Sequence, residues 1–141
     1  MSTGDKQVAA LRALLTGDFD RHKHMIELLD KDEDRGYLAL VSAAFIEIAD
    51  RTFGSADGNA AVVEWVGKIR SQSTDAADGF DPVLSEQVIL YALGKTEAED
   101  LNSQQILEAE LLLLPALVHD QGLDEAGIDE FLSAARALAQ P

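Results

Sequence analysis

The stretch DEAGIDEFLSAARALA, residues 124–139, carries the clearest structural pattern in this chain. Its apolar side chains recur at intervals of three and four residues, which places them in one stripe along a helix: Ile128, Phe131, Leu132, Ala135 and Leu138. Asp124 stands where a carboxylate caps a helix N-terminus, and Leu123, just before it, is placed to pack against Ile128. The stretch therefore predicts an amphipathic helix over 125–139 whose apolar stripe faces a core.

The same helical period recurs along the rest of the chain. Residues typical of helix ends separate the stripes, including Gly17, Asp18 and Gly94. No alternating run rich in β-branched residues is present, so we predict no sheet. The sequence predicts an all-α fold, a single domain over 1–141 built as a bundle of about seven helices, over residues 5–16, 18–29, 35–53, 58–71, 82–93, 103–120 and 125–139.

Two of these segments, 35–53 and 103–120, are apolar on nearly all sides, and we expect them to be the central helices of the bundle. They occupy corresponding places in two halves of the chain, 5–71 and 82–139, which a loop over 71–81 separates. This correspondence suggests an internal repeat of a helical unit. Chance similarity between Ala- and Leu-rich helices is the alternative.

Two places interrupt the helical pattern. Three aspartates have the spacing of the first ligands of a calcium-binding EF-hand loop: Asp30, Asp32 and Asp34. Arg35 stands where that loop needs glycine, and Val41 where it needs glutamate, so we interpret the segment as an acidic loop between two helices. Pro115 lacks an amide hydrogen, and we expect it to kink or break the helix over 103–120.

Composition limits the classes of partner and compartment. The 141 residues include 26 acidic and 11 basic side chains, for a formal net charge of −15, and 47% are hydrophobic. Such a surface repels phosphates, so we expect no nucleic-acid binding. The longest apolar run, 111–118, is too short to span a membrane and contains Pro115. With no cysteine and no signal-like N-terminal segment, the sequence predicts a soluble cytoplasmic protein.

Three side chains are candidates for a functional site. Glu110 falls inside the apolar face of a central helix, and Glu47 lies at the edge of the other central helix's apolar face. Two such carboxylates can bind a metal or exchange protons, but the Glu-x-x-His pairs of di-iron bundles are missing. We therefore expect structural ion pairs to Arg12 or Arg51 instead. His22 lies in an apolar stripe and is interpreted as a hydrogen-bonded histidine at the edge of the core.

No catalytic, cofactor or metal motif is present in the sequence, so it assigns no catalytic residue, cofactor or metal. The reading that we favour is a non-catalytic, soluble helical protein that interacts with another protein or regulates it. One alternative is an acidic inhibitor or immunity-type protein for a basic partner. The other is a helical enzyme or metal-binding protein that uses the buried carboxylates Glu110 and Glu47 with His22.

The helices carry more apolar surface than one stripe each can bury. Leu112, with some of Ile89, Leu90 and Leu93, is left over after one face of each helix is covered. We predict that the chain forms a symmetric homodimer at micromolar concentrations. Light scattering that gives the monomer mass of 15.2 kDa across that range would contradict this prediction.

Overall fold

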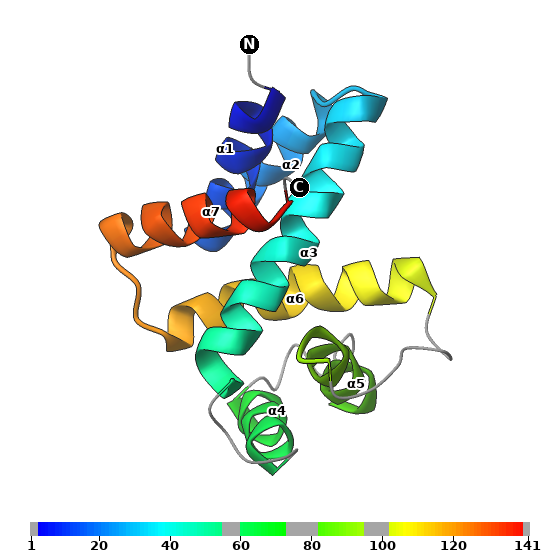
Figure 1. The fold of residues 1–141 in the computed structure, drawn as a ribbon, viewed down its shortest axis with the longest axis vertical. Helices are drawn as coiled ribbons and strands as arrows, with labels where there is room; N and C mark the ends of the chain where they lie inside the picture. The colour runs from blue at the N-terminus through cyan, green and yellow to red at the C-terminus, as the bar shows by residue number, and fades with distance from the viewer. Residues whose placement is uncertain (1–2, 55–59, 73–81, 95–101, 140–141) are drawn as a thin grey trace.

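The computed structural model describes residues 3–54, 60–72, 82–94 and 102–139. Within these residues the chain forms seven α-helices and no β-strand, which confirms the predicted all-α bundle (Figure 1). The helices are α1 Thr3–Leu15, α2 Phe19–Glu27, α3 Lys31–Phe53, α4 Ala60–Gln72, α5 Pro82–Ala92, α6 Ser103–Asp120 and α7 Glu125–Ala139. No helix in the described part of the chain is both long and apolar enough to cross a membrane.

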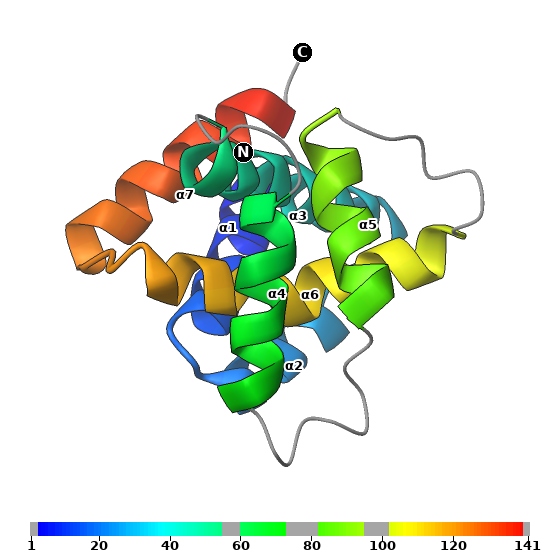
Figure 2. The same cartoon turned by 90° about the horizontal axis from the view of Figure 1, so that it is seen from below.

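Helix α3 runs through the middle of the molecule and contacts α1, α5, α6 and α7 (Figure 1). Helix α6 contacts α1, α3 and α5, so the two segments predicted to be central are both enclosed by neighbours. Helices α1 and α2 pack together toward one end of the molecule, and α4 and α5 pack together toward the other (Figure 1). Figure 2, seen from below, shows α4 and α5 side by side in front of α6. The predicted internal duplication stays a prediction, although α1 and α5, which open its two halves, each contact both central helices.

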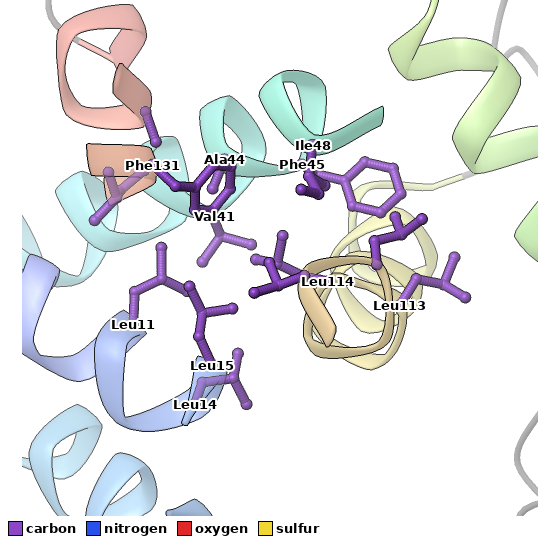
Figure 3. Packing of buried hydrophobic residues seen from close by; sticks show 14 of the residues in the cluster. Leu11, Leu14, Leu15, Val41, Ala44, Phe45, Ile48, Leu113, Leu114 and Phe131 are labelled. Carbon is purple, nitrogen blue, oxygen red and sulfur yellow. The ribbon is translucent and has the colours of Figure 1, made fainter. Parts of the chain in front are cut away.

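The core forms where α1, α3, α6 and α7 meet (Figure 3). It is built from large apolar side chains that are almost completely buried, including Leu11, Phe45, Ile48, Leu114 and Phe131. They occupy positions three or four residues apart on their own helices, so each helix turns one row inward. Helix α3 contributes on more than one side, because Leu40 and Ala43, which lie on the opposite side of the helix from Phe45, are buried as well.

Local capping explains where several helices begin. The Asp18 side chain accepts a hydrogen bond from the Arg21 amide at the start of α2. Asp124 accepts one from the Gly127 amide at 2.7 Å, as predicted for α7. Helices α3 and α6 begin with reciprocal capping boxes, formed by Asp30 with Glu33 and by Asn102 with Gln105. Each cap satisfies amides that the first helical turn leaves without a partner.

The predicted acidic loop between the second and third helices is wrong. Helix α3 begins at Lys31, so Asp32 and Asp34 lie in its first turn. Two local effects stabilise this earlier start: the capping box holds the end, and carboxylates interact favourably with the positive end of the helix dipole. The aspartates therefore begin a helix.

Pro115 does not break α6, because only one backbone hydrogen bond is lost there and the flanking Leu114 and Leu117 are buried. The expected kink at this proline stays a prediction. Leu138 departs from the predicted α7 stripe, because it is mostly exposed. It lies at the end of its helix, where neighbouring elements no longer cover it. Asp81 precedes Pro82, a pair that predicts an N-cap for α5, and it lies outside the described residues.

Helix α4 is tied to the central helices through Trp65. Its indole Nε1 donates a hydrogen bond to Asp120, at the last turn of α6. Its ring lies edge-on to Phe53 at the end of α3, with ring centroids 6.1 Å apart. One side chain therefore joins α4 to the C-terminal ends of both central helices.

Truncating the core should cost much more stability than truncating the exposed end of the same stripe. We predict that Phe131→Ala lowers the free energy of unfolding by about 3–5 kcal/mol, because it opens a cavity at a fully buried position. Leu138→Ala, on the same helix but mostly exposed, should cost less than about 1 kcal/mol. Urea denaturation of the two variants measures the difference, and similar losses would place Leu138 in the core.

Candidate functional site

An apolar groove of about 630 Å³ opens between α3, α5 and α6. Leu38, Ser42 and Ile46 follow one another at four-residue intervals along α3, so they form one row on that helix. Side chains on α6 at three- and four-residue spacing face them, and α5 closes the third side. We call this the α3–α5–α6 groove; its lining residues are Leu38, Ser42, Ile46, Tyr91, Ala92, Gln104, Ile106, Leu107 and Glu110.

Glu110 is the only charged side chain among the described residues that line this groove. It is 6% exposed, and its Oε1 accepts a hydrogen bond of 3.3 Å from the Ser42 hydroxyl. Burial disfavours the carboxylate and raises the pKa of Glu110 from 4.5 to about 7, with the Ser42 hydrogen bond opposing that shift. The groove therefore holds a carboxyl group that gains or loses its proton near neutral pH.

The expectation that an arginine pairs with Glu110 is wrong. Arg12 donates to Asp129 of α7 at 2.9 Å, and Arg51 pairs with acids at the α3–α7 contact. No ion pair to Glu110 occurs within the described part of the chain. Both arginines are held at α7, whereas the groove is bounded by α5, so neither supplies its cation to Glu110.

Glu47, by contrast, has the structural ion pair that the sequence suggested. Its Oε2 accepts from the Nε of Arg51 at 2.6 Å, one helical turn away. Two other guanidinium nitrogens of Arg51 donate to Glu130 of α7, each at 3.1 Å. The guanidinium also lies 5.3 Å from the ring centroid of Phe131. Glu47 thus helps to orient an arginine that joins α3 to α7.

His22 is hydrogen-bonded at the edge of the core, as predicted. Its Nε2 lies 2.6 Å from the hydroxyl of Tyr37 on α3, and the two rings are 5.8 Å apart. Partial burial lowers the pKa of His22, and burial raises that of Tyr37. The pair attaches the short helix α2 to α3.

The three candidate side chains therefore have separate partners: Tyr37 for His22, Arg51 for Glu47 and Ser42 for Glu110. No group of three or more potential metal ligands forms among the described residues. Whether any of the three takes part in function stays a prediction.

The groove's polar chemistry suits binding. Ser42 and Glu110 form a hydroxyl–carboxyl pair, but Ser42 lies within α3, where the backbone amides already bond along the helix. Acyl transfer needs donors that point at a developing oxyanion, which helix-interior amides do not offer. The pair offers a ligand the acceptor oxygens of Ser42 and Glu110, next to the apolar residues that line the groove.

Sequence reasoning missed the groove itself and the role of Ser42. The available signal was weak: a serine at four-residue spacing between Leu38 and Ile46, inside an otherwise apolar row. Of the apolar residues expected to be left uncovered, Leu112 is 48% exposed, whereas Ile89 is fully buried. Ile46 and Tyr91, which line the groove, are also uncovered, and the sequence did not single them out.

Comparison of the chain with protein-family models, with curated proteins and with solved structures finds no match.

Replacing Glu110 with glutamine should stabilise the protein at alkaline pH. Between pH 4.5 and about 7 the folded chain keeps a proton that the unfolded chain has lost, so the Glu110 contribution to the free energy of unfolding falls as pH rises. Glutamine stays neutral and removes this loss. We predict that Glu110→Gln is more stable than wild type by about 2 kcal/mol near pH 8, with little difference near pH 5.

Denaturation at the two pH values measures this effect. Glu108→Gln, an exposed acid on the same helix, is the control and should change stability by less than about 0.5 kcal/mol at either pH. Equal destabilisation by Glu110→Gln at both pH values would show that the carboxylate has a cationic partner in the fold.

Proposed function

We propose that this chain is a non-catalytic protein-interaction module, and that the α3–α5–α6 groove receives the apolar face of a helix from a partner protein. The observation that carries this proposal is a buried carboxyl group, Glu110, at an apolar groove that stays open to the outside. Such a combination of apolar walls and one polar group is typical of binding sites.

The walls of the groove support a protein partner. Ile46 on α3 and Tyr91 on α5 are 46% and 48% exposed, so apolar surface lies uncovered on two sides of the groove. The volume of about 630 Å³ is large enough for several apolar side chains. Covering these surfaces with apolar side chains would remove them from water and stabilise a complex.

The groove favours a helix over an extended segment. Three helices form its walls, and their backbone amides and carbonyls bond mainly along the helices. An extended peptide would bury its own backbone groups without partners, because no sheet edge is available in the described residues. A helix satisfies its backbone internally and presents only side chains, at i, i+3, i+4 and i+7.

Charge selects the kind of partner. With a net charge of −15, the chain attracts basic proteins and repels acidic ones at a distance. We therefore propose a basic partner, and we place the interaction in the cytoplasm, with which a cysteine-free chain is compatible. If that partner is an enzyme or a toxin whose helix is needed for activity, binding in the groove would make this chain its inhibitor.

A display experiment tests the groove directly. The probe is a yeast-displayed library of alanine-based helices of about 18 residues, ~27 Å long, with one face randomised among apolar residues and lysine. We expect peptides selected on the wild-type chain to bind Ile46→Gln about tenfold more weakly, because glutamine replaces an apolar contact of roughly 1.4 kcal/mol.

Leu112→Gln is the matched control. Leu112 is as exposed as Ile46 and lies on α6, but it does not line the groove. Selected peptides should bind this variant like the wild type. Three results would contradict the proposed surface: equal losses of peptide affinity in both variants, a loss confined to Leu112→Gln, or failure to select any peptide. A dimer that light scattering detects only when Ile46 is intact would instead assign the groove to a second copy of this chain.

A further inference from the structure

We propose that the partner helix places a basic side chain against Glu110, so that the groove recognises a cation among apolar contacts. This inference rests on the proposed function and specifies the chemistry of the partner at one position. The proposal is argued from the burial of Glu110, from the one hydrogen bond that the described residues donate to it, and from the apolar walls around it.

No described residue supplies the positive charge that would compensate an ionised Glu110. Within the described part of the chain, the Ser42 hydroxyl is the only group that donates a hydrogen bond to it, and it reaches Oε1 alone. The neighbouring wall residues Ile106 and Leu107 are apolar. A carboxylate in such surroundings is costly unless a cation pairs with it, and Arg12 and Arg51, the arginines expected to pair with it, are held at α7 instead.

A lysine or arginine side chain fits both parts of the groove. Its aliphatic stem can lie along the apolar walls while its charged end reaches the acceptor oxygens. Two groups accept from that end: the Glu110 carboxylate, and the Ser42 hydroxyl oxygen, which keeps its lone pairs while it donates to Glu110. An ammonium has three hydrogens to donate, so this pair of oxygens can bind it without further polar groups.

A cation bound beside Glu110 changes the protonation of this carboxyl group in the opposite direction to a purely apolar contact. Glu110 and Tyr91 are the titratable side chains among the described residues that line the groove from α3, α5 and α6. A cation beside Glu110 favours its ionised form, so binding releases a proton when Glu110 is protonated beforehand. A neutral side chain buries Glu110 further, favours the protonated form and takes up a proton instead.

The experiment compares a selected lysine-containing peptide with the same peptide carrying norleucine at that lysine. Norleucine keeps the aliphatic stem and lacks the ammonium. On the wild-type chain we expect the lysine peptide to bind at least about tenfold more tightly near pH 8. Its affinity should fall by several-fold from about pH 8 to about pH 6, whereas that of the norleucine peptide should rise.

Glu110→Gln supplies the matched variant. In it the two peptides should bind within about threefold of each other, and neither should show the pH dependence. Wild-type binding that does not distinguish lysine from norleucine, or that has the same pH slope for both, overturns the inference and leaves the proposed function standing. Failure of every peptide to bind the groove overturns both. If the variant does not fold, the comparison of the lysine and norleucine peptides on the wild-type chain still tests the inference.

Discussion

Helix α3 has to be covered on nearly every side, and the packing of the other helices follows from that constraint. Its 23 residues bury side chains toward α1, α5, α6 and α7, so no single neighbour can satisfy it. The hydrophobic effect therefore favours a bundle in which α3 passes through the centre. Helices α5 and α6 do not cover α3 completely, and the groove lies where Ser42 and Ile46 of α3 are left partly uncovered.

Polar contacts fix the outer helices in register on this apolar core. Arg51 joins α3 to α7 through Glu130, and Arg12 joins α1 to α7 through Asp129. Arg136 adds a hydrogen bond of 3.0 Å to Asp5, so α7 is also held at the N-terminal part of α1. Individually, exposed pairs of this kind contribute little to stability. Their common effect is that Arg12, Arg51 and Arg136 are held at the contacts of α7, whereas the described lining of the groove contains an acid and no base.

The fold could be predicted largely from local pattern, and the site could not. Helices 103–120 and 125–139 have the predicted ends because the cap that precedes each, at Asn102 and Asp124, acts within one turn. Glu110 could be found because its position in an apolar face is a local property. Its surroundings could not: Ser42 lies 68 residues earlier, and whether an arginine reaches Glu110 depends on how whole helices pack. The contacts of Glu110 depend on how distant helices are arranged, and the periodicity of the sequence does not encode that arrangement.

Trp65 gives this protein a built-in optical reporter of one particular junction. It is the sole tryptophan of the chain, and it is held between the ends of α3 and α6 by Phe53 and Asp120. Its emission therefore follows the separation of α4 from the central helices, whereas far-UV circular dichroism follows all the helices together. If the two signals change together during unfolding, α4 separates from the central helices only when the whole bundle unfolds. If they change separately, α4 is a part of the chain with lower local stability.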